Sequence, residues 1–146
     1  MKGWKTIWNV PEARYFNNPT HQCGEGCLRY VDNAKSLLRE HGELDTNTRL
    51  YGDKKYVKMA GNTLWNGVLF VLDAVFHIGG TKKNRPKIQD YKDAAYHRDK
   101  KLSQFVQVGY ETMHLAMGYD GNQNKDVCDA GFNLANEIIN RCALLL

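Results

Sequence analysis

The residues best suited to chemistry in this sequence recur at helical spacing between positions 62 and 77. Asn62, Asn66, Asp73 and His77 follow one another, with Phe70, at intervals of 4, 4, 3 and 4 residues. A helix would therefore carry their side chains on one narrow face. Carboxamide, carboxylate and imidazole groups can bind a polar ligand, and neighbouring Asp73 and His77 can exchange a proton. The alternatives are a hydrogen-bonded core network and the exposed edge of the helix.

Two further groups complete the predicted ligand-binding set. Tyr110 and His114 are four residues apart, with Tyr119 close behind them. Lys55 lies in the first turn of an expected helix, where free backbone amides favour an anion. The alternative without a ligand is that Lys55 lies in a solvated first turn and that the tyrosine hydroxyls bond the carbonyl groups of a turn. The predicted ligand-binding residues are Lys55, Asn62, Asn66, Asp73, His77, Tyr110, His114 and Tyr119.

A local excess of positive charge predicts contact with phosphate. The net charge of +4 is modest, but residues 82–101 contain eight basic and three acidic side chains. Such a patch can bind nucleic acid or an acidic partner, and it can equally be a solvated linker and helix face. The predicted nucleic-acid contacts are Lys82, Lys83, Arg85 and Lys87.

The four cysteines give weak metal candidates. Cys23 and Cys27 have zinc-like spacing, and His21 or His41 could join them, but no second cysteine pair follows. Cys128 and Cys142 fit small core residues better. The first residues contain no apolar run of signal-peptide length, which favours a cytoplasmic location with reduced thiols. We expect no cofactor.

These side chains must be positioned by a central apolar helix, expected at about residues 53–78. Between Lys58 and Lys82 only Asp73 and His77 titrate, so most sides of the helix should be buried. The stretch is long enough to span a bilayer. Its polar residues would be costly there, and we expect no membrane partner.

Four other helices should surround the central one, at about residues 25–41, 88–98, 100–117 and 125–144. No proline occurs in 20–85 or 87–146. Asp53 and Asp99 are expected N-caps, and Gly42 is an expected stop. Gly61 and Gly67 should mark close approach of neighbouring helices. The expected architecture is an all-α five-helix domain over residues 25–146, with 1–24 as an N-terminal extension.

Four segments carry a resemblance to a known family: residues 28–35, 53–61, Trp65-Asn66-Gly67-Val68-Leu69 and 114–121. From about Cys27 to Ala143 the chain resembles small uncharacterised helical bacterial proteins, a domain of unknown function. That family looks like the HEPN superfamily, whose members often dimerise and include RNases. Hydrolytic members have an arginine followed after four to six residues by a histidine. Here the one match is Arg14 and His21, in the extension, so the resemblance implies the fold rather than a nuclease site.

The sequence predicts a non-catalytic helical-bundle interaction module, self-associating as a homodimer. Its partner would be a protein or a nucleotide-bearing molecule. The alternative is a divergent HEPN-type RNase, or a nucleic-acid or nucleotide binder that uses residues 82–101. A metal-dependent function at Cys23 and Cys27 is a third, weaker hypothesis.

Overall fold

The computed structural model describes residues 21–78 and 85–146, and the side chains from residue 26 onward within the first range. Two predicted nucleic-acid contacts, Lys82 and Lys83, lie outside the described residues, as do residues 1–20 of the expected extension. The side chain of Cys23, a weak metal candidate, also lies outside them.

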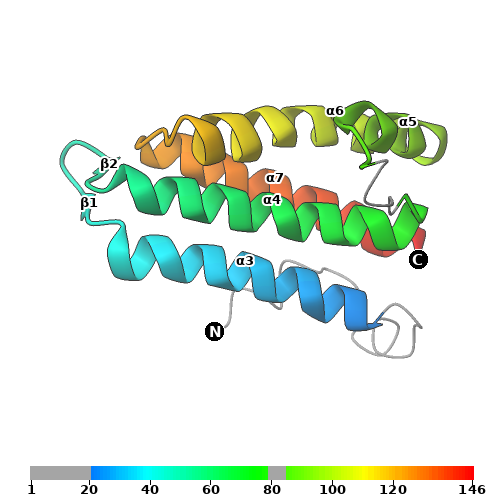
Figure 1. Cartoon of the computed structure of the whole chain (residues 1–146), viewed down its shortest axis with the longest axis horizontal. Helices are drawn as coiled ribbons and strands as arrows, with labels where there is room; N and C mark the ends of the chain where they lie inside the picture. Colours follow the sequence, from blue (N-terminus) through cyan, green and yellow to red (C-terminus); the bar gives the residue numbers. More distant parts are fainter. Residues whose placement is uncertain (1–20, 79–84) are drawn as a thin grey trace.

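The described chain forms five helical rods, which confirms the all-α bundle (Figure 1). The fourth rod is α6 continued by η1, a π-helix in which each hydrogen-bonded turn holds one residue more than an α turn. The elements are α3 (His21–His41), α4 (Lys54–Phe76), α5 (Ile88–Arg98), α6 (Lys100–Gly109), η1 (Tyr110–Tyr119) and α7 (Lys125–Leu145).

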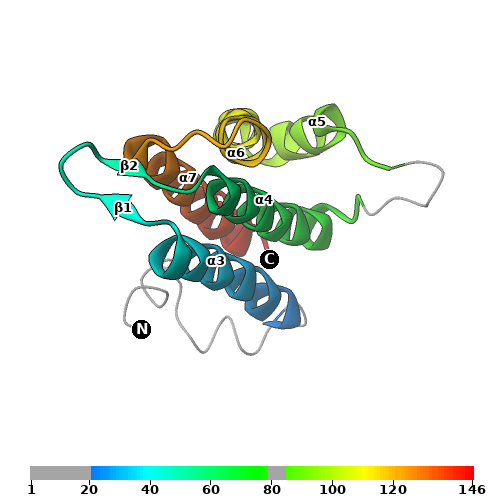
Figure 2. The same ribbon diagram turned by 60° about the vertical axis from the view of Figure 1, so that its left-hand side comes forward.

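Helix α4 lies at the centre of the bundle, with α3, η1 and α7 packed around it (Figure 2). Its apolar residues Leu64, Val68 and Leu72 are fully buried. Asp53 caps its start as expected, because the side chain accepts a hydrogen bond from the Lys55 backbone N–H at 3.0 Å. By length and composition α4 would also pass as a membrane span, and 44% of that window is buried inside the bundle.

Two glycines of α4 allow its neighbours to approach closely, as the sequence predicts. A Cβ atom on Gly61 would lie 2.5 Å from the Cβ of Met117 in η1. A Cβ atom on Gly67 would lie 2.7 Å from the Cβ of Tyr30 in α3. Glycine has a low helix propensity, but at these two positions its lack of a side chain allows close packing on two sides of α4.

The connector after α3 contains a small hairpin that the sequence did not reveal. β1 (Leu44–Asp45) pairs antiparallel with β2 (Leu50–Tyr51). Asp45 Oδ1 accepts from the Asn47 backbone N–H at 2.8 Å and shapes the turn. Strands of two residues are too short to show alternation, so the sequence shows only a gap between two predicted helices.

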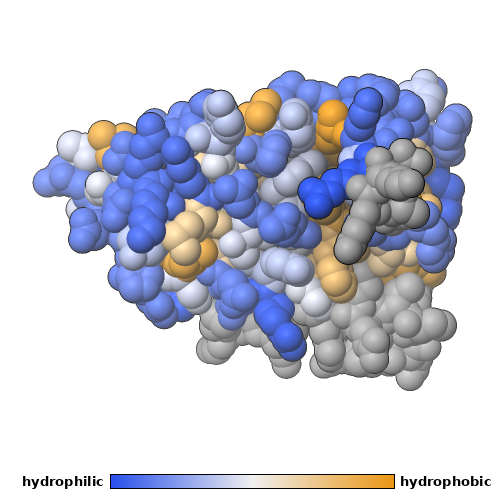
Figure 3. Space-filling model, in the orientation of Figure 1, coloured by the Kyte–Doolittle hydropathy of each residue, from blue (hydrophilic) through white to orange (hydrophobic). Residues whose placement is uncertain are grey.

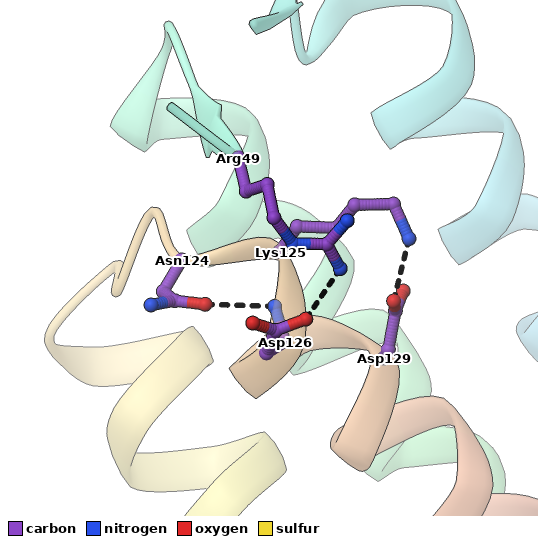
Figure 4. Close-up of polar contacts among 5 residues, drawn as sticks. All are labelled: Arg49, Asn124, Lys125, Asp126 and Asp129. Carbon is purple, nitrogen blue, oxygen red and sulfur yellow. Dashed lines mark hydrogen bonds and ion pairs between the residues drawn. The ribbon is translucent and has the colours of Figure 1, made fainter. Parts of the chain in front are cut away.

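This hairpin is joined to the start of α7. The backbone N–H of Tyr51 donates to Gln123 O at 2.8 Å, and that of Lys125 donates to Arg49 O at 2.9 Å. Figure 4 shows Arg49 also paired with Asp126, while Asn124 caps α7 through the Asp126 backbone N–H. Residues more than seventy positions apart are held together here.

Asp99 separates α5 from α6, which confirms the expected break. Its side chain accepts from the Leu102 backbone N–H at 3.1 Å and from Arg141 Nη1 at 2.9 Å. The guanidinium of Arg141 also lies over the Phe105 ring, 5.1 Å from its centroid. A single carboxylate thus caps α6 and ties it to α7.

The same carboxylate makes stability sensitive to acid. Burial pushes the pKa of Asp99 upward, but the hydrogen bonds from Leu102 and Arg141 outweigh it and hold the pKa below its ordinary value. A pKa that is lower in the folded state contributes stability above the unfolded value, about 3.9, which is lost as pH falls through the folded pKa. We therefore expect the free energy of unfolding to fall below about pH 4. Asp99→Asn should be less stable at neutral pH and show a shallower fall in urea titrations from pH 7 to pH 3. An unchanged slope would contradict this assignment.

Candidate functional site

A pocket of about 530 Å³ opens between α4, η1 and the start of α5. We call it the aromatic pocket. Its volume is in the range of small-molecule sites. It brings together one wall from each of three elements that are distant in the sequence. The lining residues are Asn62, Trp65, Asn66, Leu69, Arg85, Pro86, Ile88, Tyr91, Tyr110 and His114.

The α4 wall combines an apolar floor with two carboxamides. Trp65 is 5% exposed and Leu69 is partly buried, whereas Asn62 and Asn66 are exposed. The polar stripe of the sequence is therefore the exposed edge of α4 rather than a buried network. Asn62 Nδ2 donates to Gly118 O at 3.3 Å. Asn66 lines the pocket, and among the described residues its amide has no hydrogen-bond partner, so it can donate to a ligand and accept from it.

The η1 wall supplies two aromatic rings that face Trp65. The Tyr110 ring centroid is 5.8 Å from that of Trp65 in an edge-to-face arrangement, and 5.2 Å from that of His114. His114 lies 6.3 Å from Trp65. These separations match favourable aromatic pairs. π-helical turns are often found at functional sites, and here the π-helix forms one wall of the pocket.

The α5 wall is fixed to α4 by one hydrogen bond. The Tyr91 hydroxyl donates to Asp73 Oδ1 at 2.8 Å. Burial, and then this carboxylate, raise the pKa of Tyr91 well above its usual value. The hydroxyl therefore stays protonated at neutral pH and keeps donating to Asp73. Arg85, which is exposed, adds a positive charge at the same wall.

Four of the eight predicted ligand-binding residues line the aromatic pocket: Asn62, Asn66, Tyr110 and His114. Asp73 supports the pocket through Tyr91 and does not line it. His77 ends α4 in a left-handed conformation with φ 55°. The side chain of Asp73 bonds Tyr91 rather than the imidazole of His77, with which the sequence predicted that it could share a proton. Lys55 is exposed over the Tyr56 ring and Tyr119 is 76% exposed. Neither lines the pocket.

The sequence did not single out Trp65, Leu69, Ile88 or Tyr91 as pocket residues. Each has the apolar or aromatic character and helical spacing of a core residue, and Trp65 and Tyr91 are indeed almost buried. A signal was present in Trp65, which directly precedes Asn66 on the polar stripe. Indole rings often have one face in the core and one edge at a site.

The predicted basic region is divided between pocket and surface. Arg85 lines the pocket, and Lys87 precedes α5 as its N-cap residue. Further along, Lys100 Nζ lies 5.5 Å from the centroid of the exposed Tyr96 ring. Figure 3 shows that the face carrying α4 is largely hydrophilic, with hydrophobic side chains in small separate areas. This surface suits polar ligands better than a broad apolar interface.

The three cysteines whose side chains the structure describes do not line the aromatic pocket. Cys27, Cys128 and Cys142 are all fully buried in the core. Burial raises the pKa of the Cys128 thiol to about 11, so it stays protonated and unreactive. Within the part of the chain that the structure describes, no three His, Cys, Asp or Glu side chains gather as metal ligands do.

Comparison with known proteins gives a family and a fold. A family model described as "Domain of unknown function (DUF5618)" matches residues 23–143. The structure is similar to that of a protein of unknown function from Dyadobacter fermentans, with a TM-score of 0.77 and 35% sequence identity. That similarity covers 87% of this chain and 98% of the other. No curated protein matches the chain.

Proposed function

Because the chain belongs to the DUF5618 family, whose description names no activity, we propose a function from the site: a non-catalytic binding module for a planar anionic small molecule of the nucleotide class. The observation that carries the proposal is the convergence of Trp65, Tyr110 and His114 with two asparagine amides and an arginine in one pocket.

Each part of a nucleotide has a suitable partner in the aromatic pocket. A base can stack on the rings of Tyr110 and His114, which are half-buried and line the pocket, since every base offers a π face. The carboxamide of Asn66 can pair with the hydrogen-bonding edge of a base, because it donates and accepts together. Arg85 can bind a phosphate group through paired N–H donors.

The surroundings of His114 favour binding over acid–base catalysis. Within the described residues it contacts two aromatic rings, and no carboxylate lies within ion-pair distance of it. A catalytic histidine is usually oriented by such a group. The arrangement is therefore that of a binding surface.

Titration with mononucleotides tests the proposal. We expect AMP, GMP, CMP or UMP to quench Trp65 fluorescence in a chain carrying Trp4→Phe and Trp8→Phe. Asn66→Ala and Arg85→Ala should each weaken binding about tenfold, which is about 1.4 kcal/mol. Free nucleoside and inorganic phosphate should bind more weakly than the nucleotide, since each engages one part of the site.

The matched controls are Asn47→Ala, an exposed asparagine in the hairpin turn, and Lys87→Ala, an exposed cation close to Arg85. Both should leave nucleotide affinity unchanged. Absence of binding by all four nucleotides, or equal loss in the controls, would reject the proposal.

A second candidate is RNA binding through the basic region, favoured by Arg85, Lys87 and the Tyr96–Lys100 pair on neighbouring turns. It predicts RNA affinity that falls steeply with salt and is lost on charge reversal of Lys82, Lys83 and Arg85. An RNase activity of HEPN type would be detected in the same assay as cleavage.

Self-association and a cytoplasmic location belong to the proposal as well, and the first of them rests on the resemblance to dimerising HEPN-like proteins. Light scattering at several protein concentrations tests the first. A monomer mass throughout would remove the homodimer.

A further inference from the structure

A second hollow, of about 640 Å³, lies between α3, the hairpin and the first half of α7. We call it the asparagine groove. It shares no lining residue with the aromatic pocket. It exists because α3 packs mainly on α4 and only lightly on α7. Its walls are Lys35, Leu38 and Arg39 of α3 and Asp129, Phe132, Asn133 and Asn136 of α7, and Leu44 and Tyr51 close its hairpin end.

The base of the groove is apolar. Leu38 and Tyr51 are nearly buried, and Leu44 and Phe132 pack partly buried against the core. An apolar base with a polar rim is the usual composition of a binding site. The base would hold apolar side chains or the body of a ligand.

Asparagines along α7 present hydrogen-bonding groups that the described chain does not satisfy. Asn136 Oδ1 and Asn140 Oδ1 are both buried and make no hydrogen bond there. Buried polar atoms are rarely left this way. Of the two, Asn136 lines the groove, so its carboxamide can offer donors and an acceptor to a bound chain.

The carboxamides of the groove wall suit a polypeptide partner. Asn133, which is exposed, and Asn136 both line the groove from α7. A carboxamide that donates and accepts together is the complement of a peptide group. In an extended segment the peptide groups are not bonded to one another, so they are available to these two side chains.

The charge at the groove favours an acidic partner. Lys35 makes no ion pair within the described residues, and Arg39 is more than half exposed beside Glu40, at 4.0 Å. The acidic lining residue, Asp129, is already paired with Lys125 (Figure 4). Two cations on α3 thus face the groove without a strong partner, since exposed pairs such as Arg39–Glu40 contribute little.

We infer that the asparagine groove binds an extended acidic segment of a partner protein. The asparagines of α7 bond its backbone, Lys35 and Arg39 bind its carboxylates, and the apolar base holds alternate side chains. This binding is independent of the aromatic pocket, so either can fail without the other.

Fluorescence anisotropy on the full chain tests the inference. The probe is a fluorescein-labelled nine-residue peptide in which glutamate alternates with leucine, and its counterpart has lysine in place of glutamate. We expect the acidic peptide to bind and the basic one not to bind. Asn136→Ala and Lys35→Glu should each weaken binding at least tenfold, and raised salt should weaken it further.

The matched controls are Asn47→Ala and Lys101→Glu, both exposed and outside the groove, which should leave peptide binding unchanged. Only variants whose far-ultraviolet circular dichroism shows the same helix content as the parent are compared. If Asn136→Ala unfolds, Asn133→Ala, at an exposed position of the same wall, replaces it. Equal binding of both peptides, or equal loss in the controls, would overturn the inference.

Two other occupants give distinct results. If a synthetic peptide of residues 1–20 displaces the acidic probe from the groove and binds more tightly, the groove belongs to the chain's own N-terminal segment. If Lys35→Glu converts a dimer into a monomer in light scattering, the groove is a contact between copies. Either result overturns the partner-protein inference.

Discussion

Replacing Leu64 with alanine is expected to lower the free energy of unfolding by about 3 kcal/mol. Leu64 is fully buried in the middle of α4. Truncating a buried leucine removes its transfer free energy and leaves a cavity that the neighbours fill incompletely, at a cost of about 2–5 kcal/mol. The surrounding packing is held by α3, η1 and α7 together, so the core has little freedom to collapse.

Urea unfolding measures this effect, with Leu144→Ala as the matched control. Leu144 is 62% exposed near the end of α7, and its truncation should change stability by about 0.5 kcal/mol or less. Hydrogen exchange gives an independent check, because amides in the middle of α4 should be among the slowest to exchange. A Leu64→Ala loss no larger than that of the control would mean that α4 is not the core of the bundle.

Replacing Gly61 with alanine should cost about 2 kcal/mol or more, although alanine is the better helix former. The added Cβ would lie 2.5 Å from Met117 Cβ and 2.7 Å from both Gly118 N and Met113 O. Two of these contacts are with backbone atoms, so η1 itself must move. Such overpacking typically costs about 1–3 kcal/mol or somewhat more. The gain in helix propensity of up to about 1 kcal/mol does not offset it.

The same substitution should also disturb the aromatic pocket, because η1 carries Tyr110 and His114. Asn62→Ala is the adjacent control: it removes one hydrogen bond to Gly118 and should cost about 1 kcal/mol or less. Unfolding is measured on both variants, and Trp65 emission is compared between Gly61→Ala and the parent. A Gly61→Ala protein at least as stable as the parent would show that α4 and η1 do not meet as described.

Local signals account for the features that the sequence predicted well. α5 runs from Ile88 to Arg98 as expected, and the first helix ends at His41, just before Gly42. Asp53 and Asp99 cap the helices that follow them. Caps and stops depend on a few neighbouring residues, so one sequence is enough to find them. The family resemblance was confirmed as well, whereas the link to HEPN proteins stays a prediction.

The π-helix could not be predicted, because it packs against Gly61 of α4, a residue far from it in the sequence. We expected an α-helix over 100–117, but after Gly109 the chain forms the wider turns of η1 through Tyr119. The wider turns occur where Gly61 and Gly118 let backbones meet, a contact between residues far apart in sequence. Gly121, with φ 65°, turns the chain after η1, and Gly118 belongs to η1 itself.

The residues of the candidate site that share one helix could be predicted, whereas the contacts between different helices could not. Helical spacing placed Asn62 with Asn66 and Tyr110 with His114, because each pair belongs to one helix. It could not tell that the two pairs face each other across one pocket, which depends on how α4 and η1 cross. Nor could it indicate that α5 would supply Tyr91 and fix it to Asp73. The asparagine groove also depends on how two distant helices diverge.

The extra width of η1 has an evolutionary consequence. A π turn closes one residue later than an α turn, so losing a single residue between positions 110 and 119 would let ordinary α turns join the same ends. Such a deletion would leave the bundle intact but change the directions in which Tyr110 and His114 point relative to Trp65. Homologues should therefore fall into two length classes at this segment, and the shorter class should have lost the affinity that the longer class shares.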